Sequence, residues 1–267
     1  MYLDIGQQAA FDRFQALFGG NDRLMYTVGV ALGHSVPFFA LNLLYSLLLV
    51  SAPSFPILEK VRRNPGKYPK RSLVLKCVLY VTLMHLLSPI LPYVLYDRAL
   101  RYHPRMFDDP VPSLEIILLQ VVWAYICTDF WFYWMHRLLH TSLFYIPVHK
   151  QHHEFHITIG WAAEYAHPLE LLLGNIFPVV FAPVVFRYHY FVFAVWVGIA
   201  MMGTTFGHSG FKVPVAMSSG FHDFHHTHNT GNYGSMPYWD RICGSDRDYR
   251  RFLEKGRSEK KRLSNER

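Results

Sequence analysis

The sequence lacks the features that mark small secreted domains and soluble zinc proteins. Its three cysteines, Cys77, Cys127 and Cys243, are odd in number and far apart, so neither a disulfide framework nor a zinc ribbon can be recognised. Only 17% of the 267 residues are charged, whereas 51% are hydrophobic and 16% are aromatic. This balance is too apolar for an ordinary soluble domain and is typical of a membrane protein.

Charged residues are absent from residues 25–50, a stretch longer than the roughly 20 apolar residues that cross a bilayer. Residues 72–96 and 113–135 predict two more membrane spans. Residues 169–206 are apolar but interrupted by prolines and by Arg187, and they fit two further passes of about 18 residues each. The predicted fold class is therefore all-α, an integral membrane helical bundle. A cleaved signal peptide is not expected, because the N-terminus lacks a basic segment followed by a short apolar run.

Two basic segments predict the orientation of the chain. Residues 59–71 carry six Lys or Arg against one Glu, and residues 247–267 carry nine against four acids. Basic loops remain in the cytosol, so the third span emerges there. An even number of passes over residues 169–206 then returns the chain to the same side. We therefore expect residues 136–167, 208–228 and the C-terminus to be cytosolic.

Histidine is unusually clustered in this sequence. Twelve of the 16 histidines lie within residues 136–167 and 208–228. Residues three or four apart share one helix face, so each cluster, if it is helical, aims its imidazoles at one point. Neutral imidazole binds iron, copper, zinc and nickel, and eight ligands are too many for one ion, which predicts two ions. The eight histidines are His136, His140, His149, His152, His153, His222, His225 and His226.

The first cluster lacks the glutamate that serves as base in the H-E-x-x-H motif of zinc proteases. Arg137, Leu138 and Leu139 occupy the positions between its two histidines, which excludes that class of enzyme. Two further histidines are predicted to join the metal site. They are His167, in Glu-Tyr-Ala-His-Pro, and His208, in Gly-His-Ser-Gly.

Some polar residues are predicted to orient the metal-binding imidazoles, which usually need such partners. Asp129 lies seven residues before His136, on the same face of the predicted helix, and a buried acid needs a partner. Asp223 and Asn232 are further candidates. Aromatic residues near the clusters could line a path for an apolar substrate, and these are Phe130, Trp131, Trp134, Trp161 and Tyr165.

The three clusters resemble the histidine boxes of the fatty acid hydroxylase superfamily, whose members are membrane-bound, non-haem di-iron oxygenases of the endoplasmic reticulum. Residues 152–155, 164–170, 208–210 and 239–242 look most like the corresponding segments of 4-methylsterol monooxygenases. The Glu-Tyr-Ala-His-Pro segment favours these enzymes over sterol 25-hydroxylases, C5-desaturases and sphingolipid hydroxylases. The resemblance extends over residues 129–249.

The chain departs from the family pattern at three places. Phe221 stands where a histidine often precedes the last box, and Phe206 stands where an acidic residue is common. His156, Ile157 and Thr158 replace small residues and proline after the second box. Because the boxes are intact, these departures concern the identity of the substrate and not the oxygenase chemistry.

The resemblance implies two iron ions, dioxygen, and electrons from NAD(P)H that arrive through cytochrome b5 and its reductase. The implied reaction is oxidation of the 4-methyl group of a sterol intermediate, followed by the action of a separate sterol dehydrogenase. The implied location is the endoplasmic reticulum membrane, in contact with membrane lipid and without a nucleic-acid partner. The basic tail either touches anionic lipid or docks an acidic electron donor.

Three other interpretations remain open from the sequence. The chain could be another sterol or lipid hydroxylase or desaturase of the superfamily, such as a sterol 25-hydroxylase. It could be a metal transporter, although transporters place ligands within broken helices near the bilayer midplane. A zinc-stabilised structural protein is the third. The predicted regions are residues 1–112, N-terminal membrane helices; 113–249, the catalytic domain; and 250–267, a basic tail.

Overall fold

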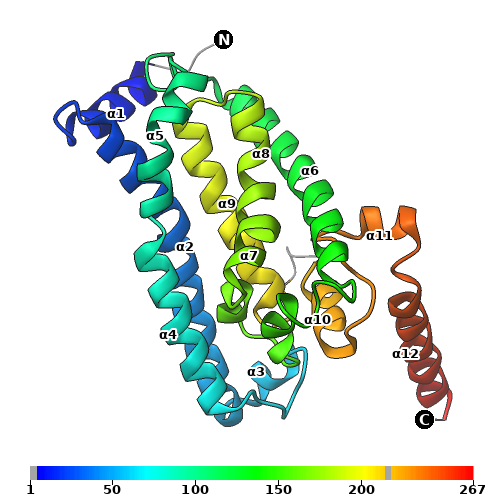
Figure 1. The fold of residues 1–267 in the computed structure, drawn as a ribbon. Coiled ribbons are helices and arrows are strands. Elements are labelled where there is room, and N and C mark those ends of the chain that lie inside the picture. The colour runs from blue at the N-terminus through cyan, green and yellow to red at the C-terminus, as the bar shows by residue number, and fades with distance from the viewer. Residues whose placement is uncertain (1–4, 214–217, 267) are drawn as a thin grey trace.

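The computed structural model describes residues 5–213 and 218–266, and every regular element within these ranges is a helix (Figure 1). Their order begins with α1 (Ile5–Ala16), α2 (Asp22–Ser51), η1 (Ala52–Ser54), α3 (Pro56–Val61), α4 (Arg71–Leu87), α5 (Ile90–Tyr102) and α6 (Leu114–Leu139). It continues with η2 (His149–Glu154), η3 (Gly160–Glu164), α7 (Pro168–Glu170), η4 (Leu171–Ile176), α8 (Phe177–Val185) and α9 (Tyr190–His208). The last three are α10 (Ser218–His228), α11 (Pro237–Cys243) and α12 (Arg247–Asn265).

Five helical stretches are long and apolar enough to cross a membrane, which confirms the predicted all-α membrane fold. They are Asp22–Ser54, Arg71–Tyr102, Leu114–Leu139, Pro168–Val185 and Tyr190–His208. The last two occupy the segment for which the sequence predicted two passes. Arg187 lies in the turn between them with a φ of 51°, and its guanidinium is 4.9 Å from the centre of the Tyr102 ring.

Helices α2 and α9 pack along each other through small residues. A Cβ atom added to Gly33 would lie 2.8 Å from the carbonyl oxygen of Ala194, and one added to Gly198 would lie 3.5 Å from the carbonyl oxygen of Gly33. Small residues allow such close backbone contact between membrane helices, where apolar surface alone gives little association energy. This contact joins the N-terminal helices to the later ones in a single bundle. The division into three regions remains a prediction.

An aromatic cluster closes the end of the bundle where α1 lies. The ring of Tyr190 packs against Tyr26 and Phe107 at centroid distances of 5.9 and 5.1 Å. Its hydroxyl donates a hydrogen bond to the carbonyl oxygen of Met25 at 2.8 Å. Burial of these rings and satisfaction of the hydroxyl stabilise the start of α9 against α2.

The basic loop 59–71 lies at the opposite end of the bundle, together with α10 and α12 (Figure 1). The backbone N–H of Arg63 donates to the carbonyl oxygen of Gly210, and the N–H of Lys212 donates to that of Val61, both at 2.8 Å. Asn64 donates to the carboxylate of Asp223 on α10 at 3.1 Å. The two basic segments that predict the orientation therefore share one end of the molecule.

This arrangement makes a prediction about topology. In a variant with exposed Cys243 changed to Ser, single cysteines at Lys67 and Ser258 should react with a membrane-impermeant thiol reagent from the same side of the membrane. A cysteine at Arg105, in the exposed loop after α5, should react only from the other side. Labelling of all three positions from one side would contradict a bundle with five crossings.

Candidate metal centre

The histidines meet where α6, η2, α9 and α10 come together. Nine of the ten predicted ligands fall into two groups, within each of which one nitrogen or oxygen per residue lies within 4.8 Å of the others. The five-histidine group contains His136, His140, His149, His153 and His225. The four-histidine group contains His152, His208, His222 and His226.

The two later sequence clusters do not each point at a single site, as the spacing had suggested. The i and i+4 members of a cluster stay together, so His149 and His153 share one group and His222 and His226 share the other. The intermediate residues cross over, with His152 and His225 joining the opposite groups. The reason is that His152 and His225 each adjoin another histidine in sequence, and adjacent residues on a helix are turned about 100° or more from each other, so the two neighbours point to different groups. As a result, η2 and α10 each supply histidines to both groups.

Hydrogen bonds at Nδ1 determine which nitrogen is free in three of the rings. His136 Nδ1 donates to the carbonyl oxygen of Tyr233 at 2.7 Å, and His225 Nδ1 donates to that of Gly231 at 2.6 Å. A carbonyl oxygen can only accept, so Nδ1 carries the proton and Nε2 of the neutral ring presents a lone pair. His226 is held in the same way by Phe155, at 3.1 Å, in the other group.

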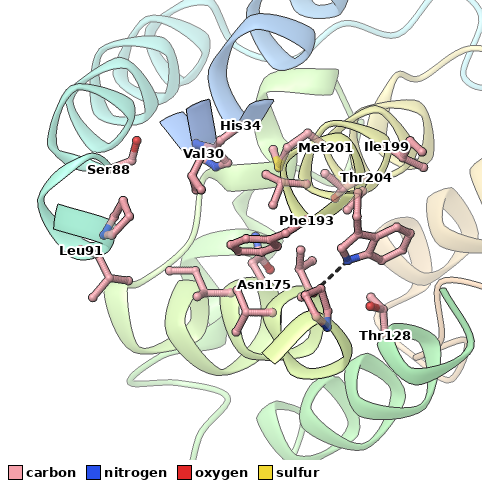
Figure 2. A pocket seen from close by; sticks show the side chains of 18 of the residues that line it. Val30, His34, Ser88, Leu91, Thr128, Asn175, Phe193, Ile199, Met201 and Thr204 are labelled. Carbon is pink, nitrogen blue, oxygen red and sulfur yellow. Dashed lines mark hydrogen bonds between the residues drawn. The ribbon is translucent and has the colours of Figure 1, made fainter. Parts of the chain in front are cut away.

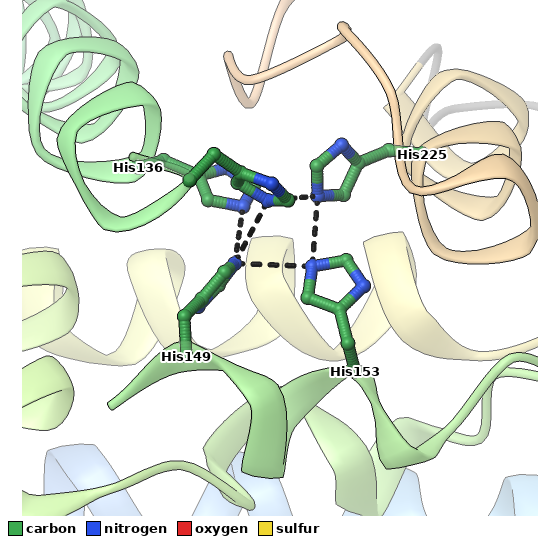
Figure 3. Close-up of side chains that lie close together, drawn as sticks. His136, His149, His153 and His225 are labelled. Atoms are coloured by element: carbon green, nitrogen blue, oxygen red, sulfur yellow. Dashed lines mark hydrogen bonds between the residues drawn. The ribbon is translucent and has the colours of Figure 1, made fainter. Parts of the chain in front are cut away.

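The Nε2 atoms of the five-histidine group face a common centre (Figure 3). Five pairs of these atoms are separated by 3.0 to 3.1 Å. In the four-histidine group the corresponding distances are 2.8, 3.1 and 3.3 Å. Lone pairs this close repel one another unless a cation lies between them.

The distances fit a metal ion. A metal–nitrogen distance of about 2.1 Å separates neighbouring ligands by about 3.0 Å in an octahedron and by about 3.4 Å in a tetrahedron. The five-histidine group matches the octahedral value. Protons are poor substitutes for the metal, because burial and then the neighbouring imidazoles lower the pKa of His149, His153 and His225 far below the usual range.

Glu170 is a partner that the sequence did not predict. Its Oε1 accepts a hydrogen bond from His149 Nδ1 at 2.8 Å, and the side chain is buried. A carboxylate in this position fixes the ring and makes its other nitrogen a better ligand. The available signal was an acid beside an apolar stretch, since a buried acid needs a partner, which was also part of the argument for Asp129.

Two of the residues predicted to orient imidazoles do so indirectly, by holding the loop that contacts the imidazoles. Asp129 accepts hydrogen bonds from the hydroxyl of Ser235 and the N–H of Met236, both at 2.8 Å. Asn232 donates to the carbonyl oxygen of Phe221 at 2.9 Å. Both therefore secure the loop 229–236, whose carbonyl groups hold two of the histidines, instead of touching an imidazole.

Asp223, the third of these predicted residues, accepts from Thr158 and from Asn64. Those two bonds connect α10 to the segment after η2 and to the basic loop. Burial raises the pKa of the Asp223 carboxyl, although both hydrogen bonds oppose the rise. The role of Asp223 in the described structure is to hold three segments together behind the metal groups.

Gly231 is required by its surroundings. It has a φ of 52°, and a Cβ atom would lie 2.0 Å from the carbonyl oxygen of Ser245. No side chain fits that space, and the left-handed backbone conformation also favours glycine. The carbonyl group of this residue is therefore fixed where it meets His225.

His167 lies outside both metal groups. Its Nδ1 accepts a hydrogen bond from the N–H of Leu169 at 3.2 Å and so caps the short helix α7. The sequence placed it in the site because of its neighbours in the motif, but the turn before Pro168 directs it to the start of the helix. It is only half-buried, in contrast to the histidines of the groups other than His140.

A third cluster joins α2, α4 and η3. Glu164 lies 3.0 Å from His34 Nε2 and 2.9 Å from His85 Nε2, and the two rings stack at 4.3 Å. Burial alone would raise the pKa of the Glu164 carboxyl, but the two imidazoles outweigh it and hold the pKa well below the usual range. His34 Nε2 is hydrogen-bonded to Glu164, whereas His85 Nε2 and His34 Nδ1 have no hydrogen-bond partner in the described part of the chain, and the three side chains lie close enough together to hold a metal ion.

A cavity of about 970 Å³ extends from the metal groups into the bundle (Figure 2). His208 and His222 lie at its metal end, and Phe193, Met201 and Leu91 are among its apolar walls. Its size is in the range of sites for small organic ligands. It lies between membrane-spanning helices, so an occupant can be as apolar as a lipid.

Among the described residues that line this cavity, none of the five aromatic residues predicted from the sequence occurs. Phe130 packs against Trp131 and Trp134, and Trp131 faces Phe177 and Phe181 of α8 instead of the cavity. Trp161 donates from its indole to Ser46, and the hydroxyl of Tyr165 donates to Glu154. Proximity in sequence to the histidines did not reveal which face of each helix turns inward.

The comparisons with known proteins agree with this architecture. Residues 121–245 match the family model described as fatty acid hydroxylase. A candidate methylsterol monooxygenase of Dictyostelium discoideum is 31% identical over 242 residues, which cover 87% of this chain and 87% of that protein.

Two further relatives carry different names. A very-long-chain aldehyde decarbonylase of Oryza sativa subsp. indica is 35% identical over 187 residues, covering 66% of this chain and 70% of that protein. The fatty acid hydroxylase domain-containing protein 2 of Homo sapiens is 29% identical over 245 residues, covering 90% and 72%. No solved structure matches the chain.

The two groups make a prediction about metal content. The purified protein should hold about two metal ions per chain, since each group has enough imidazoles for one ion. His149→Ala and His226→Ala should each lower the content to about one, because each removes a ligand from a different group. Elemental analysis of detergent-purified protein measures this.

His167→Ala is the matched control, because this histidine belongs to the same motif but caps a helix. It should keep the wild-type metal content. Loss of a metal ion from this variant would mean that His167 is a ligand after all. Unchanged content in His226→Ala would contradict the second metal group.

Proposed function

The chain belongs to the fatty acid hydroxylase family, and from that premise we propose that it is a membrane-bound oxygenase that oxidises a C–H bond of a lipid with dioxygen. The observation that carries the proposal is the meeting of the two histidine groups with the apolar cavity at His208 and His222. A lipid in that cavity would present its carbon atoms directly to the metal ligands. The family match supports an oxidoreductase.

Iron is the metal we propose for both groups, which would be held by the nine histidines named above. Two bound iron ions would supply the reduction of dioxygen and an oxidant strong enough to take hydrogen from an unactivated methyl group. The protein contributes the rest. It keeps the imidazoles neutral and oriented, excludes water through the buried setting of the groups, and positions the substrate.

The proposed substrate is a sterol intermediate that carries a methyl group on carbon 4. Support comes from the methylsterol monooxygenase named among the relatives, from the Glu164–His167 motif, and from a cavity large enough for a rigid lipid. A sterol dehydrogenase that removes the oxidised carbon would act next. The aldehyde decarbonylase relatives favour a second candidate, in which a long-chain aldehyde occupies the same cavity.

A metal transporter is less well supported. Transporters hold their ions near the bilayer midplane within broken helices. Here His136 and His208 lie in the last turns of α6 and α9, at the end of the bundle where the basic segments lie. The groups have the position of a site at the membrane surface.

Sterol analysis tests the proposed substrate. Expression of the chain in a cell that lacks its own sterol C4-demethylation should lower the 4-methylsterols and restore the demethylated products. The histidine ligands are needed for this reaction, so His222→Ala expressed at the same level should leave the 4-methylsterols unchanged. The measurement is the sterol profile of extracted membranes.

Accumulated 4-methylsterols in cells that express the wild-type chain would contradict the sterol proposal. If long-chain aldehydes are consumed in those same cells, the second candidate holds instead. The His222→Ala control distinguishes either reaction from an effect of membrane protein expression alone.

For the location we propose the endoplasmic reticulum membrane, with the histidine groups and the C-terminus in the cytosol. Support comes from the excess of basic residues in loop 59–71 and in the tail. Electrons would then come from NAD(P)H through a cytosolic reductase and cytochrome b5. An acidic donor would be attracted by the tail, since complementary charges raise the rate of encounter.

Helix α12 packs against α10, which carries three of the histidines, so a donor bound to α12 would lie near the metal groups. Its residues Tyr249 and Phe252 pack against Phe224 of α10 at centroid distances of 5.2 and 5.3 Å. Phe224 immediately precedes His225, so a donor on α12 would lie close to the helix that carries three of the histidines. The remaining surface of α12 is basic and exposed.

Charge reversal tests the donor proposal. Lys255→Glu with Lys261→Glu should slow turnover driven by cytochrome b5 several-fold at low salt, and the difference should shrink as salt screens the charges. Turnover driven by a chemical reductant should be spared, because the histidines are untouched. Arg101→Glu with Arg105→Glu, at the other end of the bundle, is the control with the same change in charge. Equal losses under both sources of electrons would point to membrane attachment or folding instead.

A further inference from the structure

A small chamber lies beside the large cavity, among histidines of both metal groups. Its volume is about 20 Å³, and the histidines around it come from both groups, His136 and His149 from one and His152 and His208 from the other. A space of about 10–15 Å³ holds one water molecule, so the chamber has room for a single small molecule or for the tip of a larger one. It is the place where both groups face the same point.

The chamber and the cavity share a wall, which we call the neck. It consists of Phe132, Gly174, Asn175, Thr204 and His208, each of which lines both spaces. A carbon atom that enters the chamber from the cavity would pass these five residues. Figure 2 shows Asn175 and Thr204 among the side chains that surround the cavity.

Asn175 is the only side-chain amide among the described residues that line either space. It lies on η4, a π-helical turn, and such turns are rare and concentrate at functional sites. Its only side-chain hydrogen bond within residues 5–213 and 218–266 is a long one, 3.4 Å from Nδ2 to the carbonyl oxygen of Ala163. Its amide oxygen is therefore available to a ligand, and a polar group left unpaired beside an apolar cavity is costly.

We propose that the neck is a hydroxyl-binding site, in which Asn175 and Thr204 bind the alcohol group of a lipid next to the carbon that is oxidised. This inference rests on the proposed oxygenase function. An amide can both accept from and donate to a hydroxyl group, and it carries no charge that would repel an apolar lipid. The ligand class is a lipid alcohol with its hydroxyl on the carbon beside the reacting one.

The geometry of a 4-methylsterol agrees with this position. Its 3-hydroxyl and its 4-methyl groups are on adjacent ring carbons, so a methyl group in the chamber places the hydroxyl at the neck. Other polar side chains line the cavity as well. Arg98 and His103 reach it from the end of α5, and in the pair of His34 with Glu164 the carboxylate already accepts from the imidazole, while His34 Nδ1 is unpaired but buried away from the cavity surface. Asn175 lies instead at the metal end, in the neck.

Binding of matched lipids to the purified protein tests the neck. The probes are a 4-methylsterol and its 3-deoxy counterpart, and the readout is the dissociation constant of each from the shift in thermal unfolding. The wild-type protein should prefer the alcohol about three- to tenfold, the usual contribution of one hydrogen bond. Asn175→Leu should lose the preference by binding the alcohol more weakly, while its affinity for the deoxy lipid and its metal content stay the same.

Two further variants make the test specific. Thr204→Val removes the other polar group at nearly constant volume and should reduce the preference in part. Ser88→Ala is the control, because Ser88 lines the cavity but its hydroxyl is already bonded to the carbonyl oxygen of His85 at 2.9 Å. It should keep the full preference.

The outcomes separate the neck from the proposed function. A preference for the alcohol that depends on Asn175, in a protein that oxidises no sterol, supports the neck and rejects sterol oxidation. Sterol oxidation with a preference that survives in Asn175→Leu overturns the neck alone. Equal affinity of the wild-type protein for the two lipids also overturns the neck proposal. Loss of metal and of affinity for both lipids in Asn175→Leu overturns it too, because the role of Asn175 would then be structural.

Discussion

The structure depends on holding nine imidazoles neutral, eight of them buried and that of His140 half-buried, with their unprotonated nitrogens about 3 Å apart. Burial excludes protons from them, and the lone pairs repel unless cations lie between them. This constraint explains why so much hydrogen bonding surrounds the groups. Each backbone carbonyl at an Nδ1 atom commits one nitrogen to donation and the other to the metal. Without those acceptors the rings could rotate or change tautomer and relieve the repulsion.

The acceptors are held by a second layer of polar residues. The loop 229–236 carries the carbonyl groups that meet His136 and His225, and it is anchored by the buried carboxylates of Asp129 and Asp240. Asp240 accepts from the N–H groups of Tyr233 and Gly234 at 2.9 and 2.7 Å. Buried acids of this kind are costly unless their bonds are complete. Their presence in an apolar bundle is explained by the need to fix the loop whose carbonyl groups orient the imidazoles.

The same arrangement connects the metal groups to an apolar space inside the membrane. His208 of α9 and His222 of α10 line the end of the cavity. Gly174 and Asn175 of η4 line both the cavity and the small chamber beside the histidines. A lipid can therefore reach the groups from within the bundle, while the basic segments and α12 lie beside them at the surface. Of the departures from the family pattern, Phe206 alone is among the described residues that line this cavity, and it belongs to neither metal group.

Hydrophobic runs and histidine spacing by themselves determined the membrane fold and the identity of nearly all the clustered histidines. These features follow from local rules, namely the length of an apolar helix and the face shared by residues three or four apart. Only the tertiary structure decided how the histidines divide, because His152 and His225 cross between groups that no single helix contains. It also placed His167 outside the two groups, added Glu170 as a hydrogen-bond partner of His149, and turned Phe130, Trp131 and Trp134 of α6 away from the cavity. Which face of a helix points inward depends on its neighbours, and these contacts link residues far apart in the sequence.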